Sequence, residues 1–460
     1  MKELLFQEFE EVSAKQWKQK IQYDLKGADY NEQLITHTSA GIDIKPFYTA
    51  EDVSDLPQIE NAANWNICEK IYVTSPAEAL RKAHYKIEKG SNAIWLIFPE
   101  ADIVLEELLP KLSNNVTWYL QPLFLDPDFC LKLKSFSETQ PSAYLLLDVV
   151  GKLARTGNFF NNIHSDFEML QEILQHTRNF KSVLSINAGL YHNAGATIPQ
   201  QLAYALGHFS EYANRFPEEP QLKVSYQLAI GSDYFQEIAK IRALRWLHRS
   251  LAKEFGLPEE CHIIAEPGKR NKTLYDYNVN LLRTTTESMS AILGGADSIC
   301  NLPYDALYHK DNEFGDRIAR NQLLVMRHEA YFGKVGNVAD GSYYIETLTR
   351  QLADLALDIF KNVENAGGIL QQLKNGIIQK KIKQSAAEEQ ERFNTGDLVL
   401  IGTNKYENPQ DRMKDDLELF PFLKRKPRKT LIEPILERRL SEEYEQKRLE
   451  NESEKPGNDD

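Results

Sequence analysis

Cysteine is scarce in this chain, with 4 residues among 460, and the four are widely separated. Cys68, Cys130, Cys261 and Cys300 form no CxxC pair, so neither a disulfide framework nor a zinc ribbon is expected. The N-terminus has no basic region followed by an apolar run, and no apolar run is long enough to cross a bilayer. These absences predict a cytoplasmic protein with free thiols and no transmembrane helix.

Other missing patterns exclude further classes of protein. The 10 histidines form no HExxH pair, which argues against a metal site, and the absence of a GxSxG elbow argues against an α/β-hydrolase. The Gly-Gly pairs at 294–295 and 367–368 lack the Lys and Ser/Thr of a phosphate loop, so they are expected to end helices in left-handed conformations. A formal net charge of −13 argues against a general nucleic-acid or membrane binder.

What the chain does contain is a regular alternation of short apolar runs and amphipathic helical stretches. Eight runs are predicted to be strands: 67–73, 93–98, 117–124, 143–150, 182–186, 223–230, 262–265 and 298–302. Six helices are predicted among them: 76–88, 166–178, 199–216, 235–255, 279–293 and 316–331. Such alternation predicts parallel strands joined by right-handed crossovers. It favours an α/β fold with a closed (β/α)8 TIM-type barrel, and an open doubly wound sheet is the alternative.

The flanking segments divide the chain into three parts. Residues 1–60 are predicted to form an N-terminal arm that wraps a partner, with a Ser-capped helix over 13–23. The aromatic residues of this arm require burial, either on a partner chain or on the chain's own barrel; they are Trp17, Tyr30, Phe47 and Tyr48. Residues 61–400 are assigned to the barrel, and residues 401–460 form a helical C-terminal extension.

Several elements are expected around this last boundary. Two amphipathic helices are predicted over 341–365 and 370–393, followed by one short strand within 398–406. Leu436, Leu440 and Tyr444 share one helical face, so that part of the extension is expected to dock as a single helix. Residues 452–460 are predicted to be disordered.

Polar residues near the predicted strand ends are candidates for chemistry. His192, preceded by Tyr191, follows a predicted strand and either donates a proton to a carbonyl or is an exposed loop histidine. Asp297 and Glu266 are expected to cap strand ends, and Asp340 to stabilise a turn. Arg317 and Arg320 are expected to pair with acidic neighbours on their helix.

Several segments, in this order, resemble the methylmalonyl-CoA mutase family. They are DLKGADYN (24–31), AGATIPQQLAYALGHFSEYANR (194–215), AIGSDYFQEIAKIRALRWL (229–247), LRTTTESMSAILGGADSI (282–299), RIARNQLLVMRHE (317–329) and DGSYYIETLT (340–349). The resemblance implies a TIM-type barrel and an isomerase that uses adenosylcobalamin to interconvert methylmalonyl-CoA and succinyl-CoA through radicals. It also implies that some members consist of a large catalytic chain and a smaller related chain.

Against that family pattern, the residues expected to contact substrate are replaced. Cys68 stands where catalytic members carry an Arg, and Lys70 where they carry a Tyr. Leu146 replaces a substrate-contacting Gln, and Thr156 falls near the position of a substrate Arg. The family's Tyr-His pair falls on Gly189 and Leu190, two residues before Tyr191-His192, and its Arg-Thr-His-x-Gln stretch becomes HIIAE, which ends at Glu266.

Two longer features of the family are also missing. The glycine-rich insertion expected between Phe98 and Trp118 is absent, and the DxHxxG motif that ligates the corrinoid occurs nowhere in the sequence. The resemblance with these losses implies a non-catalytic small subunit in a heterodimer, with a homologous large chain that carries adenosylcobalamin. The alternative is an autonomous, divergent acyl-CoA mutase barrel that uses a separate corrinoid protein. An assembly factor is disfavoured because no GTPase motif is present.

Overall fold

The computed structural model describes residues 8–53, 59, 64–113, 115–424 and 428–454. In these residues eight parallel strands follow the order β6–β5–β4–β3–β10–β9–β8–β7. The two outer strands of this order also meet, because Leu147, just beyond β6, forms a parallel bridge with Leu184 of β7. The amide of Ser185 donates to the Leu147 carbonyl at 2.8 Å. The predicted (β/α)8 barrel is therefore confirmed, and the open doubly wound sheet is excluded.

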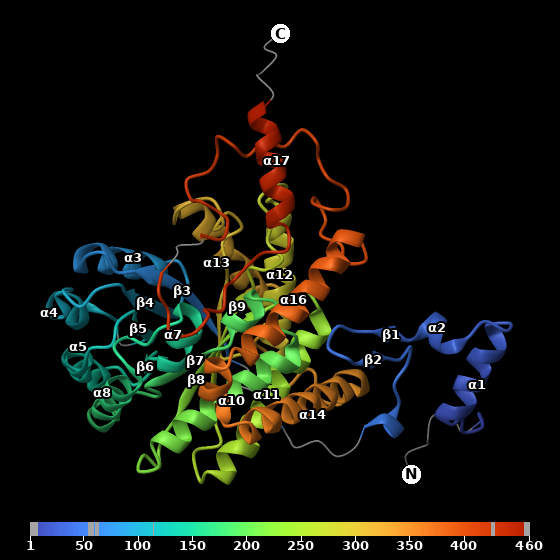
Figure 1. The fold of residues 1–460 in the computed structure, drawn as a ribbon, viewed down its shortest axis with the longest axis horizontal. Helices are drawn as coiled ribbons and strands as arrows, with labels where there is room; N and C mark the ends of the chain where they lie inside the picture. The colour runs from blue at the N-terminus through green and yellow to red at the C-terminus, as the bar shows by residue number, and fades with distance from the viewer. Residues whose placement is uncertain (1–7, 54–58, 60–63, 114, 425–427, 455–460) are drawn as a thin grey trace.

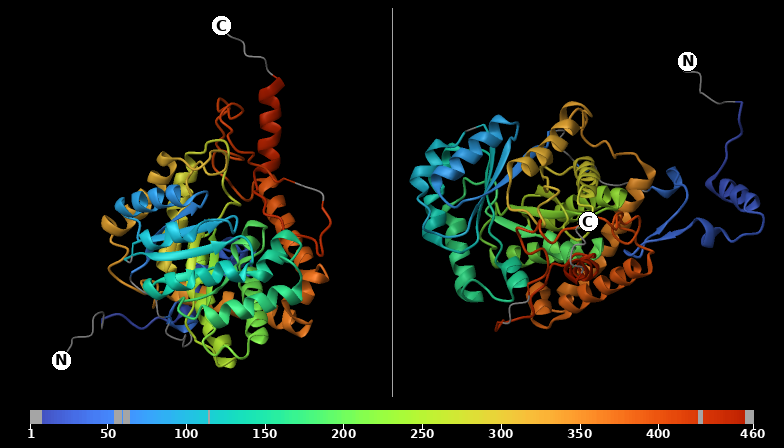
Figure 2. Two further views of the ribbon diagram at one scale, coloured as in Figure 1. Left: turned by 90° about the vertical axis from the view of Figure 1, so that its left-hand side faces the viewer. Right: turned by 90° about the horizontal axis from the view of Figure 1, so that it is seen from above.

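The strands form where buried apolar runs were predicted. They are β3 (Asn66–Tyr72), β4 (Ala93–Phe98), β5 (Thr117–Pro122), β6 (Ala143–Leu145), β7 (Leu184–Asn187), β8 (Val224–Ile230), β9 (His262–Pro267) and β10 (Ser298–Cys300). Every residue of β8 is buried, as expected for a strand covered on both faces. Figures 1 and 2 show the helices arranged around these strands.

The helices that surround the strands begin and end within three residues of the predicted limits. They are α3 (Pro76–Glu88), α8 (Ile163–His176), α10 (Ile198–Arg215), α11 (Tyr234–Glu254), α12 (Val279–Gly294) and α13 (Glu313–His328), with α14 (Tyr343–Asn365) after them. Gly295 ends α12 at φ 88°, and Gly367 follows α14 at φ 98°, as predicted for both Gly-Gly pairs. A large apolar core lies between the strands and this helical layer.

Inside the barrel a second, smaller core is formed by side chains that point toward the axis. Its members are Cys68, Ala93, Trp95, Tyr119, Leu146, Ile264 and Cys300. Below it, the Tyr119 hydroxyl lies 2.7 Å from Nε2 of His262 and 2.5 Å from Oγ of Ser298. Because His262 and Ser298 begin β9 and β10, this polar group fills the amino-terminal end of the barrel.

Three predicted elements near the strands and the C-terminal helices are wrong. The strand predicted over 143–150 stops at Leu145, because the Asp148 side chain accepts the Gly151 amide at 2.8 Å and caps helix α7 (Val149–Thr156). The helix predicted over 370–393 is divided at Gly376 (φ 72°) into α15 (Gly368–Lys374) and α16 (Ile377–Thr395). The strand predicted within 398–406 is a single bridge between Ile401 and Lys405.

The N-terminal arm projects from the body of the molecule (Figure 1). The predicted helix is confirmed as α1 (Ala14–Asp24), capped by Ser13, whose Oγ accepts the Gln16 amide at 3.3 Å. Further along lie α2 (Tyr30–Leu34), a hairpin of β1 (Thr36–His37) and β2 (Asp43–Ile44), and the 3-10 turn η1 (Ala50–Asp52). Part of the predicted arm, residues 1–7, 54–58 and 60, lies outside the described residues.

The C-terminal extension lies along the barrel and ends in α17 (Glu442–Glu454), which stands over the body of the molecule in Figure 2. The helical face predicted for residues 436–444 is wrong, because Leu436 and Leu440 precede α17 in a segment that hydrogen-bonds to barrel loops. The predicted disorder is wrong for residues 452–454, which are helical, and residues 455–460 lie outside the described part. No helix among the described residues is long and apolar enough to cross a membrane.

Candidate functional site

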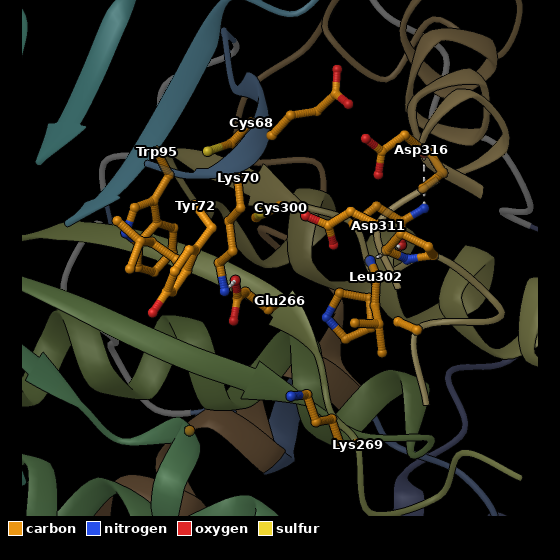
Figure 3. A pocket seen from close by; sticks show the side chains of 18 of the residues that line it. Cys68, Lys70, Tyr72, Trp95, Glu266, Lys269, Cys300, Leu302, Asp311 and Asp316 are labelled. Atoms are coloured by element: carbon orange, nitrogen blue, oxygen red, sulfur yellow. Dashed lines mark hydrogen bonds and ion pairs between the residues drawn. The ribbon is translucent and has the colours of Figure 1, made fainter. Parts of the chain in front are cut away.

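A cavity of 990 Å³ opens at the carboxyl ends of the barrel strands (Figure 3). Residues two apart on a strand point to the same face, and every barrel strand except β6 contributes at least one side chain to the described lining. Those from the strands and the turns directly after them include Cys68, Lys70, Tyr72, Trp95, Ile97, Gln121, Asn187, Gln227, Glu266, Cys300 and Leu302. This is the end of a TIM-type barrel at which enzymes of this fold place their chemistry.

The centre of the cavity is occupied by an ion pair between Lys70 of β3 and Glu266 of β9. The Lys70 ammonium also lies 4.3 Å from the centre of the Trp95 ring, a cation–π contact. Burial by itself would lower the pKa of Lys70, but the charge of Glu266 outweighs it and holds that pKa above its ordinary value. Lys70 therefore stays protonated and paired, which leaves it no free electron pair to act as a base near neutral pH.

Two thiols lie beside this ion pair. Cys68 of β3 and Cys300 of β10 are register partners on neighbouring parallel strands, and both line the cavity. Burial raises the pKa of the Cys68 thiol well above its ordinary value, and its contact with Cys300 raises it further. Cys68 is therefore a neutral thiol, which cannot bind a carboxylate as the guanidinium in catalytic family members is expected to do.

The seven positions predicted to lie in a vestigial pocket do not all come together. Cys68, Lys70, Gly189 and Glu266 line the cavity. The other three are absent from its lining: Leu146 belongs to the inner core, Leu190 to the outer core, and Thr156 lies at the end of α7. Oγ1 of Thr156 donates to the Lys152 carbonyl at 2.8 Å, and its neighbour Arg155 reaches the cavity instead.

The pair Tyr191-His192 lies on the short helix α9 (Gly189–Asn193), directly after β7. The expected exposed loop histidine is wrong, because glycines pack against the imidazole: a Cβ on Gly268 would lie 2.4 Å from Nε2 of His192. Burial lowers the pKa of His192 well below its ordinary value. Tyr191 is fully buried, 2.6 Å from Nε2 of His208. Neither side chain lines the cavity, so neither Tyr191 nor His192 is placed to donate a proton to a molecule bound there.

The polar residues near the strand ends act mainly as structural partners. Asp297 accepts the Ile263 amide and pairs with Arg245, both at 2.7 Å, and Asp340 pairs with Arg242 at 2.5 Å. Glu266 was predicted to cap a strand end, but it forms an ion pair with Lys70 across the cavity.

Arg320 is ion-paired, but its partner is Glu69 of β3 at 2.8 Å, so the predicted acidic partner on its own helix is wrong. Trp95 and Cys300 were not among the predicted site residues. Their inward position could have been found from the two-residue alternation on β4 and β10.

The described lining of this cavity gives no support for a bound adenosylcobalamin. The C-terminal extension contributes Leu419 and Glu437 to that lining. His309 is the one histidine among the lining residues, and its Nδ1 lies 3.2 Å from Asp305. With a charged pair at the centre and the chain's own extension in the lining, no step of radical chemistry is assigned to these residues.

Comparison with known proteins connects the fold to one family. A family model described as "Methylmalonyl-CoA mutase" matches residues 135–452. The chain is 32% identical over 464 residues to the "Methylmalonyl-CoA mutase small subunit" of Porphyromonas gingivalis, covering 91% of this chain and 73% of that protein. The protein of the same name from Streptomyces virginiae is 26% identical, with 88% and 73% covered. That from Propionibacterium freudenreichii subsp. shermanii is 28% identical, with 84% and 67% covered.

Proposed function

The chain belongs to the methylmalonyl-CoA mutase family, and we propose that it is the non-catalytic small subunit of a heterodimeric mutase. In this proposal the partner is a homologous large chain, which carries adenosylcobalamin and interconverts methylmalonyl-CoA and succinyl-CoA. The small subunit stabilises the large chain by mass action, since binding favours the folded partner. The names of three similar proteins support this role, because each is a small subunit.

The observation that carries the proposal is the ion pair between Lys70 and Glu266. By the resemblance to the family, these positions hold a Tyr and a Gln that contact substrate in catalytic chains. Here the two side chains neutralise each other across the cavity. Neither side chain is free to contact a thioester or a corrin ring. The two replacements therefore act together, because each one removes a substrate contact and supplies the charge that pairs with the other.

The arm supports an obligate partner. Trp17 is 48% exposed and Tyr23 is 79% exposed, and α1 has no buried residue. Trp17 stacks on Phe47 at 4.2 Å, so the arm packs on itself while leaving its outer aromatic surface open. Large exposed aromatic side chains are typical anchors of protein–protein interfaces.

The test is native mass spectrometry of this chain, captured by an affinity tag from the cytosol of its own host. A one-to-one complex with a larger, corrinoid-bearing chain is the expected result. A lone chain or a homodimer would overturn the proposed role. A variant that lacks residues 1–53 serves as the matched control, because it retains the barrel and removes the exposed aromatic surface.

The size of the cavity supports a second candidate function for this chain, that of an autonomous acyl-CoA mutase barrel that takes its corrinoid from a separate protein. A volume of 990 Å³ is enough for part of an acyl-CoA ester. Calorimetric titration of methylmalonyl-CoA onto the isolated chain separates the two candidates. The small-subunit role predicts no binding heat above that of dilution, whereas saturable binding with catalytic turnover on addition of a corrinoid protein would establish the autonomous enzyme.

A further inference from the structure

Two cysteines far apart in sequence lie next to each other on the wall of the cavity. Cys68 and Cys300 are register partners on β3 and β10, and both belong to the inner core of the barrel. Both also line the cavity, where Cys68 is 1% exposed and Cys300 is 5% exposed. Figure 3 shows the two side chains near Lys70, on the side of the strands that faces the cavity.

The backbone already holds this pair within bridging distance. Neighbouring strands lie about 4.8 Å apart, and disulfide-linked residues have Cα atoms roughly 4.4 to 6.8 Å apart. Cys300 is near enough to Cys68 to raise the pKa of its thiol. Joining the two sulfur atoms therefore requires side-chain rotation and only a small backbone adjustment.

The other two cysteines have different surroundings. Cys130 lies on α5 (Pro127–Lys132) within the outer core, and Cys261 packs against that same core just before β9. Neither belongs to the inner core or lines the cavity. The cavity therefore distinguishes one pair of thiols from the remaining two.

We propose that Cys68 and Cys300 form a dithiol modification site, which takes a low-molecular-weight disulfide as co-substrate and closes to a bridge between β3 and β10. One cysteine thiolate attacks a sulfur of the small disulfide, whose S–S bond breaks and releases one thiolate. The second cysteine thiolate then attacks the mixed disulfide, releasing the other thiolate and forming the intramolecular bond. The two protons lost by the cysteines protonate the two released thiolates, so the small disulfide is reduced as the protein is oxidised.

The surroundings determine the rate and the product of this reaction. Because burial raises the pKa of Cys68, its reactive thiolate is scarce, and the exchange is slow. The bridge, like the two neutral thiols, carries no charge, so the apolar inner core accepts it without the cost of burying an ion. The site is independent of the proposed subunit role, since it requires only the described barrel.

The test uses the full-length chain in glutathione buffers of increasing oxidised fraction, followed by acid quenching, alkylation and peptide mass spectrometry. The expected product is a cross-linked peptide pair that contains Cys68 and Cys300. Thermal unfolding of the oxidised chain is expected to shift upward by about 3 °C, since a long loop is closed, and dithiothreitol reverses the shift.

Three variants separate this site from general thiol oxidation. In Cys68→Ser and in Cys300→Ser the remaining thiol carries a glutathione adduct, and the thermal shift is lost. In the matched control Cys261→Ser the cross-link and the thermal shift both persist. Separate glutathione adducts on Cys68 and Cys300 in the unmodified chain would overturn the proposal, and so would full alkylation of both in the most oxidising buffer. If a serine variant does not fold, the cross-link map of the unmodified chain decides the question.

Discussion

The two segments outside the barrel, the arm of residues 8–53 and the extension of residues 401–454, meet the rest of the chain in different ways. The extension is joined to barrel loops by backbone hydrogen bonds, among them Ile435 to Ala154 at 2.8 Å and Leu440 to Arg270 at 2.9 Å. The arm contacts the body through apolar side chains of its second half: Ile42 belongs to the large core outside the barrel strands, and the ring of Tyr48 lies 5.1 Å from that of Tyr344 on α14. Figure 1 shows the same contrast, with α17 above the barrel and α1 away from it.

This difference indicates which segment is part of the chain's own fold. The extension is hydrogen-bonded to the barrel and buries Ile432, Ile435 and Leu440 within this molecule. The arm satisfies its backbone locally but leaves aromatic surface exposed, as in a segment that packs on another protein. Stability of the isolated chain should therefore depend on the extension, and association on the arm.

The largest expected change in the free energy of unfolding comes from a substitution in the extension, at Glu445. Glu445 is 1% exposed, accepts the Leu274 amide at 2.7 Å and pairs with Arg439 at 2.6 Å. Glu445→Ala would leave the buried guanidinium unpaired, which costs about 3 to 5 kcal/mol. Urea unfolding followed by circular dichroism measures this loss. The control Glu443→Ala, at an exposed carboxylate on the same helix, should change the free energy of unfolding by less than about 1 kcal/mol.

The second prediction concerns the effect of pH on His248, which is buried on α11 in the helical layer around the barrel. Burial lowers the pKa of His248 from 6.5 to about 4. The unfolded chain therefore binds a proton near pH 6.5 that the folded chain excludes until about pH 4, so stability falls as the pH drops through this interval. The loss amounts to about 3 kcal/mol. The variant His248→Gln should show a shallower fall than the wild type and than His84→Gln, which alters an exposed histidine. Equal slopes in all three would contradict the assigned burial effect.

Changing the arm should separate folding from association. Trp17→Ala is expected to leave the urea midpoint of the isolated chain almost unchanged, because Trp17 is half exposed and its stacking partner Phe47 also belongs to the arm. Its affinity for the large subunit should fall by about 2 kcal/mol, or roughly thirtyfold, as for an interface anchor. Surface plasmon resonance measures the affinity, with Lys15→Ala on the same helix as the control. Unchanged affinity would show that the arm does not bind the partner.

The smallest effect is expected at His192, which does not line the cavity. Turnover of the assembled mutase should stay within about twofold in His192→Ala, whereas removing a general acid costs about a hundredfold. Steady-state kinetics of the complex with methylmalonyl-CoA gives this ratio. A loss near a hundredfold, with the complex intact by gel filtration, would assign a catalytic role to this side chain.

Much of the barrel could be predicted because its signals are local. Alternating apolar runs and amphipathic helices located all eight strands, and Ser13 and Gly295 marked helix ends through their own side chain or backbone freedom. The errors arose where a local pattern was ambiguous. The run that follows Leu145 is as apolar as a strand, but the Asp148 side chain caps a helix there.

The candidate site was less predictable, because its members come from different strands. The sequence resemblance placed Lys70 and Glu266 near a pocket, but nothing local indicated that their charges would meet. Leu190 and Thr156 lie close in sequence to the lining residues Gly189 and Arg155, yet helical geometry turns both away from the cavity.

Motifs and hydrophobic periodicity are properties of short stretches, so the family resemblance, the barrel and the replacement of residues expected to contact substrate could be predicted from the sequence alone. Three features could not: the pairing of Lys70 with Glu266, the position of Cys68 beside Cys300, and the burial of Ile432, Ile435 and Leu440 of the extension. These outcomes depend on strand register and on packing between distant segments. A hydrogen-bonded register is set by the closure of the whole barrel, and no single segment contains it.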